Sequence, residues 1–139
     1  MEETAEIARF FLDELKKQHK NAGALVVALS GDLGAGKTAF TQAVGRELGV
    51  KSKVKSPTYV IMQKYLLKTK GYKFLFHLDA YRLKNEKELL HLGWKEIIAD
   101  KNHIVFIEWP EMVSGAMPAH AKFIYITNDD SGNRNFKLN

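Results

Sequence analysis

The residues most able to do chemistry form one short run. It reads Gly31-Asp-Leu-Gly-Ala-Gly-Lys-Thr38, which matches the pattern Gly-x-x-x-x-Gly-Lys-Ser/Thr. Glycines in such a loop let the backbone curl so that successive N–H groups point at an anion. Lys37 would supply a cation to the β- and γ-phosphates of a nucleotide, and the Thr38 hydroxyl can bind Mg²⁺. The pattern predicts a phosphate-binding loop, or P-loop, whose nucleotide-binding residues are Asp32, Leu33, Gly34, Ala35, Gly36, Lys37 and Thr38.

The segments on either side of this loop are of the kind that a P-loop requires. Residues 24–30 are nearly all apolar, which is typical of a strand buried on both faces of a parallel sheet covered by helices. Residues 37–48 are predicted to be a helix, since Phe40, Val44 and Leu48 recur at a spacing of four. Such a strand delivers the loop to the sheet edge, and the helix adds unpaired N–H groups and the positive end of its dipole. A glycine-rich turn that matches by chance is the less favoured alternative.

A P-loop also needs a carboxylate at a neighbouring strand end, and this is usually an Asp after an apolar strand. Two candidates are present. The run from Ile104 to Glu108 is the purer apolar strand, but it ends in Glu. The run from Phe74 to Asp79 ends in Asp, but its pattern is that of a hairpin arm. Either residue could also be an ordinary charge where a strand meets solvent, so the residues alone leave the choice open.

Two other features could belong to such a site. His77 and Asp79 lie two apart on a predicted strand and so share a face. They could form a metal pair, but we favour a partly buried, hydrogen-bonded histidine because no third nitrogen or sulfur ligand is evident nearby. Ser56-Pro57-Thr58 follows the P-loop helix, where nucleotide switches place a threonine that senses the γ-phosphate. The alternative there is a simple turn fixed by the proline.

The remaining pattern predicts the elements that would hold this site. It consists of a helix over 3–18, two hairpin strands over 59–67 and 72–79, a helical region over 86–99 interrupted at Gly93, a buried strand over 103–108, a looser stretch after Trp109-Pro110, and a closing hairpin over 122–127 and 134–138. Together these elements predict an α/β protein with a three-layer α/β/α P-loop fold. Its mixed sheet would have a parallel core and antiparallel hairpin strands, in a single domain over 1–139.

Composition excludes several classes of function. The 139 residues include no cysteine, which excludes a disulfide framework, thiolate zinc, iron–sulfur ligation and a cysteine nucleophile. The net charge of +5 leans mildly toward anionic partners but does not choose between a nucleotide enzyme and an RNA-binding module. No signal peptide is evident, and the longest apolar run is too short to cross a bilayer. We therefore expect a cytoplasmic protein with no membrane partner.

In order along the chain, the motifs resemble those of the TsaE family, small bacterial P-loop ATPases needed for threonylcarbamoyladenosine modification of tRNA. A P-loop alone would indicate only a superfamily, whereas the ordered set is much more specific. The segments that carry the resemblance are Gly31–Thr38, Ser56–Thr58, His77-Leu-Asp-Ala-Tyr-Arg82, Glu88 with Leu92-Gly93, and Ile107-Glu-Trp-Pro-Glu111.

The resemblance implies roles for the central residues. Gly34 to Thr38 would cradle the phosphates of ATP, with Lys37 stabilising the charge that develops during hydrolysis. Thr38 and Glu108 would bind Mg²⁺, so that Glu108 is the carboxylate on the metal. Asp79 is similar to the family's acidic residue near the γ-phosphate, where it would orient water or couple to the switch.

The resemblance also implies roles at the edge of the site and beyond it. Thr58 would belong to a switch-like loop, and Trp109 would lie beside the site, with a packing aromatic as its alternative. Thr4 and Arg134 would touch the adenine. The family acts with TsaB and TsaD, of which TsaD transfers the threonylcarbamoyl group, so tRNA would be met indirectly through that complex.

Two other function classes share parts of this pattern. A small-molecule kinase would use the same P-loop but needs an acceptor pocket and usually an arginine-rich lid, whereas the stretch after Glu108 holds only Arg134. A binding module, such as an RNA-binding protein or a nucleotide switch, would grip a nucleotide or tRNA without turnover. GTP-binding proteins usually carry an Asn-Lys-x-Asp-type guanine clamp, and the sequence contains none.

Overall fold

A computed structural model describes residues 2–19, 23–31, 36–50, 61–67, 71–128, 131 and 134–138, with the backbone alone for 2–4. Its elements in chain order are α1 (Glu2–Gln18), β1 (Leu25–Ser30), α2 (Lys37–Glu47), β2 (Met62–Leu66), β3 (Phe74–Asp79), α3 (Glu86–His91), α4 (Trp94–Ala99), β4 (His103–Glu108), the 3₁₀ helix η1 (Pro110–Ala116), β5 (Lys122–Asn128) and β6 (Arg134–Leu138). These elements confirm the strands and helices predicted from the hydrophobic pattern, to within a few residues at their ends.

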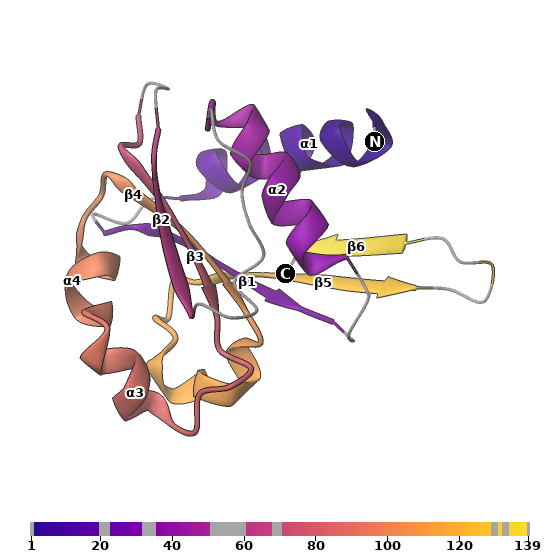
Figure 1. Cartoon of the computed structure of the whole chain (residues 1–139). Helices are drawn as coiled ribbons and strands as arrows, with labels where there is room; N and C mark the ends of the chain where they lie inside the picture. The colour runs from indigo at the N-terminus through magenta and orange to yellow at the C-terminus, as the bar shows by residue number, and fades with distance from the viewer. Residues whose placement is uncertain are drawn as a thin grey trace.

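The strands form one mixed sheet in the order β2-β3-β4-β1-β5-β6 (Figure 1). The inner strands β3, β4, β1 and β5 run parallel to one another. The outer strands β2 and β6 pair antiparallel with β3 and β5, as the two predicted hairpins require. Because parallel strands end at the same edge, the carboxyl ends of β1, β3 and β4 come together.

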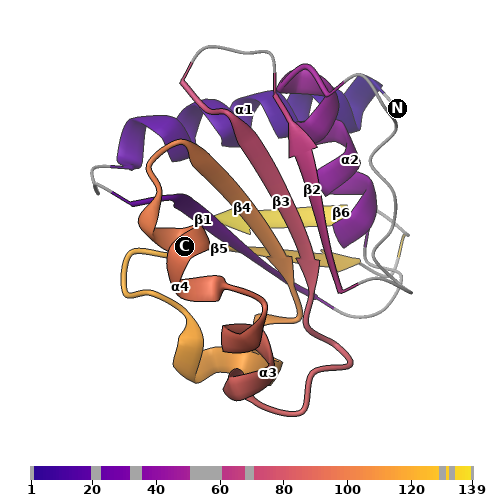
Figure 2. The same cartoon turned by 60° about the vertical axis from the view of Figure 1, so that its left-hand side comes forward.

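Helices cover both faces of the sheet, which gives the three predicted layers (Figures 1 and 2). Helices α1 and α2 lie on one face, and α3, α4 and η1 lie on the other. Alternate residues of β1 therefore enter two different cores: Leu25, Val27 and Leu29 pack beneath α1 and α2, while Val26 and Ala28 face the opposite layer. This double burial is the reason why the run over 24–30 is almost entirely apolar.

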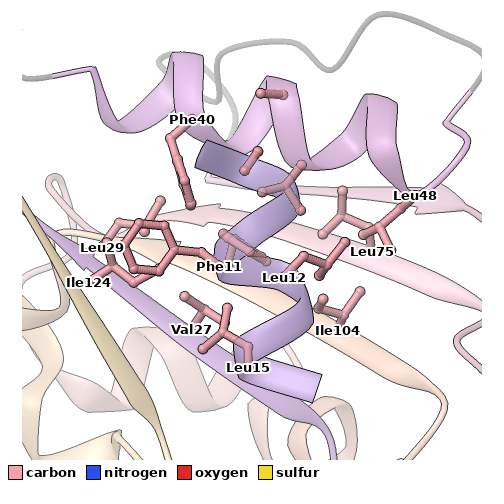
Figure 3. Close-up of a cluster of buried hydrophobic side chains, with 14 of the residues drawn as sticks. Phe11, Leu12, Leu15, Val27, Leu29, Phe40, Leu48, Leu75, Ile104 and Ile124 are labelled. Carbon is pink, nitrogen blue, oxygen red and sulfur yellow. The ribbon is translucent and has the colours of Figure 1, made fainter. Parts of the chain in front are cut away.

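The core beneath α1 and α2 also holds the C-terminal strand in place. Figure 3 shows Phe11 of α1 and Phe40 of α2 among the buried side chains of this layer. The ring of Phe136 on β6 lies 6.2 Å from that of Phe11 and 5.5 Å from that of Phe40, measured between centroids. This aromatic cluster fixes β6 against the start of α2, where the P-loop motif ends.

The stretch after Trp109 differs from the looser segment that the sequence predicts. It forms η1, which begins with Pro110 at its first turn. The indole N–H of Trp94 on α4 donates to the carbonyl of Ala116 at 2.9 Å and so ties η1 to that helix. A 3₁₀ turn has no 3.6-residue hydrophobic period, so the pattern of this segment gave no helical signal. No helix in the described ranges is long and apolar enough to span a bilayer.

Candidate active site

The two candidate carboxylates lie side by side. Strand β3 pairs antiparallel with β2 and parallel with β4, so it is both a hairpin arm and a core strand. In the register of β3 with β4, Asp79 lies opposite Glu108. Asp79 and Glu108 therefore both lie at the same edge of the sheet, because each ends one of two parallel strands. The two candidates do not exclude each other.

The start of α2 brings the lysine of the motif to that edge. Gly36 caps the helix with φ 101°, a left-handed conformation that favours glycine. Lys37 follows as the first helical residue and is buried, with only 5% of it exposed. Its ammonium donates to the carbonyl oxygen of Gly31 at 2.5 Å. The side chain of Lys37 therefore folds back toward Gly31, the residue that follows β1.

Thr38 and Glu108 contact each other across the sheet edge. The Thr38 hydroxyl lies 3.1 and 3.3 Å from the two carboxylate oxygens of Glu108, and Glu108 is 4% exposed. Hydroxyl and carboxylate oxygens are the donors that Mg²⁺ takes in nucleotide sites. The pair thus offers the chemistry that a magnesium ion would need, on residues that lie 70 positions apart in the sequence.

His77 is a hydrogen-bonded core residue. Its side chain is fully buried, and its Nε2 lies 2.5 Å from Oε2 of Glu108. This contact confirms the interpretation that we favoured over a metal pair with Asp79. Among the described residues, no group of three or more histidines or acidic residues is placed to hold a metal.

Asp79 lies partly buried at the end of β3. Its Oδ1 accepts the backbone N–H of Tyr81 at 2.9 Å, which closes a turn after the strand. Burial raises the pKa of Asp79, and the charge of Glu108 adds to this, while the Tyr81 hydrogen bond and the charge of Lys37 oppose it. The net effect is a carboxylate that binds a proton more readily than an ordinary Asp, which suits a group that handles water.

Trp109 packs against the core and also lies beside the candidate site. Its ring packs against the core under α4 and η1 and also lies over Lys37, whose Nζ is 4.1 Å from the ring centroid. The ring of Tyr81 also lies close to it, with 4.9 Å between the two ring centroids. Trp109 is the one non-glycine residue with positive φ, 59°, in the part of the chain that the structure describes. A tryptophan held in this sparsely populated conformation is typical of a functional position.

Arg134 reaches the P-loop from the far end of the sequence. A Cβ atom on Gly36 would lie 2.9 Å from Cζ of Arg134, so the guanidinium rests directly against the glycine that begins α2. Arg134 is the first residue of β6 and is exposed. The structure thus brings this residue to the N-terminal end of α2, where the P-loop motif ends.

Several predicted site residues lie outside the described residues. They are Asp32, Leu33, Gly34 and Ala35 of the loop, Thr58 of the switch-like segment, and the side chain of Thr4, whose backbone belongs to α1. Their assignments stay predictions.

Sequence reasoning missed two hydrogen bonds at this edge. One joins His77 to Glu108, and the other runs from the Ser30 hydroxyl to Oε2 of Glu111 at 2.8 Å. Ser30 is the last residue of β1, so Glu111 steadies the point at which the chain leaves the sheet for the P-loop. A polar residue at the end of an otherwise apolar strand was the one signal for this contact.

Comparison with known families fits this geometry. The family described as "Threonylcarbamoyl adenosine biosynthesis protein TsaE" matches residues 1–136. The chain belongs to the TsaE family. The TsaE protein of Haemophilus influenzae, "tRNA threonylcarbamoyladenosine biosynthesis protein TsaE", is 35% identical over 92% of this chain and 77% of its own length. The protein of that name from Nostoc sp. is 36% identical over 81% of this chain and 68% of its own length.

A solved structure supports the same fold. The crystal structure of YdiB from Bacillus subtilis superposes with a TM-score of 0.71 and 28% identity, covering 99% of this chain and 78% of that one. The TsaE chain described here therefore has a P-loop fold with a mixed sheet flanked by helices. Its site lies where that fold places a nucleotide, at the carboxyl ends of parallel strands.

Proposed function

We propose that this TsaE protein binds and hydrolyses ATP, with TsaB and TsaD as partners, in the threonylcarbamoyladenosine modification of tRNA. The observation that carries the proposal is the meeting of Lys37, Thr38 and Glu108 at one sheet edge. A nucleoside triphosphate with its magnesium ion is typically bound by a lysine and by oxygen ligands at the start of a helix that follows a glycine-rich loop. Family membership and the P-loop fold support the same function.

In this proposal Lys37 and the loop amides bind the phosphates. The Lys37 ammonium would leave the carbonyl of Gly31 and donate to the β- and γ-phosphate oxygens, which carry more charge than a carbonyl. Because the lysine is already buried at this point, little further ordering of its side chain is needed. Thr38 and Glu108 would hold Mg²⁺, which neutralises charge on the β- and γ-oxygens when it is bound.

Asp79 is proposed to orient the attacking water. It lies beside Glu108 in the sheet register and faces the site from the neighbouring strand. Its raised pKa makes it a better proton acceptor than an unperturbed Asp. Thr58 would sense the γ-phosphate, and Trp109 would act as a contact for that switch or for a partner.

The whole chain over 1–139 is proposed to be a single ATPase domain that works in the cytoplasm. Neither a small-molecule kinase nor a binding module without turnover is favoured by a specific observation at this site.

Partner dependence is tested by reconstitution. We expect slow ATP hydrolysis by the isolated chain and faster turnover when TsaB, TsaD and tRNA are added, because a partner could supply the arginine that stabilises charge on the transferring phosphate. Phosphate release measured with each component left out in turn identifies which one stimulates. Equal rates with and without the partners would contradict the partner dependence, and no hydrolysis under any condition would contradict the ATPase assignment.

Arg134 provides a test of the nucleotide site. Its guanidinium lies against Gly36, so Arg134→Ala is expected to raise the dissociation constant for ATP about tenfold, the loss of roughly 1.4 kcal/mol of binding energy. Arg134→Lys should restore little, since an ammonium lacks the planar fork of a guanidinium. Fluorescence titration with a labelled ATP measures these constants.

Lys137→Ala is the matched control for Arg134. It removes the same charge from the same strand, but Lys137 lies three residues further along β6 and so faces the other side of the hairpin. The control should bind ATP like the wild type. Equal losses in the two alanine variants would show a general charge effect and contradict a local contact.

A further inference from the structure

We propose that His77 is a positioning residue of this site, whose imidazole N–H holds the Glu108 carboxylate in the orientation that receives Mg²⁺ and nucleotide. The inference rests on the proposed nucleotide-binding function and adds to it a residue that would touch neither the ion nor the nucleotide.

The contact is short and completely buried. His77 on β3 has none of its surface exposed, and its Nε2 lies 2.5 Å from Oε2 of Glu108 on the neighbouring strand β4. The two strands are paired in parallel register over this whole segment, so both ends of the hydrogen bond are fixed by the sheet. His77 therefore holds Glu108 from within the core, where both side chains are buried.

The surroundings of the ring determine where its proton lies. Nδ1 of His77 is buried and has no hydrogen-bond partner within the described part of the chain. A proton on Nδ1 would leave a buried N–H donor without an acceptor. Nε2 would then carry no proton, and it would face the Glu108 carboxylate without a hydrogen bond unless that carboxylate were itself protonated. A proton on Nε2 avoids both costs and makes the short contact an N–H···O hydrogen bond. His77 is thus a donor to Glu108.

The hydrogen bond from His77 makes the two carboxylate oxygens of Glu108 different. Oε2 accepts from His77 and also lies 3.1 Å from the Thr38 hydroxyl, while Oε1 lies 3.3 Å from that hydroxyl and receives nothing from the ring. The carboxylate is therefore fixed by one oxygen, and the other remains available for a ligand on the side of Thr38. A metal-ligating carboxylate is commonly oriented in this way by a hydrogen bond from behind.

Packing alone does not account for a histidine at this position. On its own face of the sheet, His77 lies between Leu75 and Asp79 along β3 and opposite the buried Phe106 of β4. An apolar side chain at this position would fill the same space without an unpartnered nitrogen. Glu108, in contrast, would lose its buried donor. The unpartnered Nδ1 costs free energy, and this cost is explained if Nε2 is needed to hold the Glu108 carboxylate.

The test compares His77→Leu with His77→Gln, whose amide N–H can occupy the position of Nε2. Binding of a fluorescent ATP analogue is titrated with Mg²⁺, and a parallel titration is made in EDTA. For His77→Leu we expect the Mg²⁺ midpoint to rise about ten- to a hundredfold, the usual effect of losing such a supporting contact, with little change in EDTA. His77→Gln should restore most of the loss.

His103→Leu is the matched control. His103 also sits beside a carboxylate, with its Nε2 3.4 Å from Asp100, but at the opposite end of β4. Its removal should leave the Mg²⁺ midpoint unchanged. Equal midpoints for wild type and His77→Leu, or equal losses in His77→Leu and His77→Gln, would overturn the positioning role.

A measurement on the wild type without metal or nucleotide makes the inference independent of how the leucine variant folds. Long-range ¹H–¹⁵N correlation of the His77 ring should show the proton on Nε2, and an Nδ1–H ring would overturn the proposal. If the wild type binds no Mg²⁺–ATP, the proposed function fails and the positioning role fails with it. If the wild type responds to Mg²⁺ and His77→Leu responds equally, only the positioning role fails.

Discussion

Replacing Lys37 by alanine is expected to lower ATP turnover at least about a hundredfold, the usual cost of losing one charged donor to a developing phosphate charge. The ammonium is buried at the mouth of the P-loop, where its field is screened less than at the surface. Phosphate release under saturating ATP, with TsaB and TsaD present, measures the loss.

Lys95→Ala serves as the control for Lys37, since Lys95 is an exposed lysine on α4, in the layer on the other face of the sheet. It should hydrolyse ATP at the wild-type rate. Thermal unfolding of both variants checks that the fold is intact, because Lys37 also packs on Trp109. Undiminished hydrolysis in a folded Lys37→Ala variant would refute the site.

Replacing Asp79 by asparagine is expected to separate binding from hydrolysis. The amide oxygen of Asn can still accept the N–H of Tyr81, so the turn after β3 is kept. The variant loses the carboxylate that would take a proton from water, so turnover should fall about 10²- to 10⁴-fold. ATP affinity should be retained, because in the proposed site the loop and Lys37 hold the phosphates.

Asp100→Asn is the corresponding control for Asp79. Asp100 also accepts a backbone N–H two residues on, from Asn102 at 2.8 Å, but it lies at the other end of the sheet, before β4. The two substitutions are chemically identical, and only the one at the candidate site should slow hydrolysis. A fall in ATP affinity that accounts for the whole loss in Asp79→Asn would instead assign this carboxylate to binding.

The fold could be predicted from sequence wherever one local pattern had a single physical explanation. The apolar run over 24–30 required burial on both faces, and the structure provides it with helices on each side of β1. The spacing of Phe40, Val44 and Leu48 predicted α2, since these side chains line one face that packs on the sheet. Segment η1 was not predicted, because its contacts with α4 are tertiary and its own pattern is not periodic.

The choice between Asp79 and Glu108 shows where local pattern reached its limit. Each looked like a strand end, and the hairpin pattern of 72–79 argued against a parallel core strand. In the structure β3 pairs antiparallel with β2 and parallel with β4, so it is a hairpin arm and a core strand at once. Pairing register depends on the partner strand, which a run of six residues does not specify.

By itself the sequence predicted the phosphate loop, determined the strand and helix on either side of it, and contained a set of motifs specific enough to indicate the TsaE family. These features are local or follow one another in order along the chain. The tertiary structure alone decided that Thr38 meets Glu108 across 70 residues, that His77 holds Glu108 across 31, and that Arg134 rests against Gly36. Such contacts form when the sheet assembles and the hydrophobic core is buried. Burial brings distant segments into contact, but the contact produces no periodic pattern in the sequence of either segment.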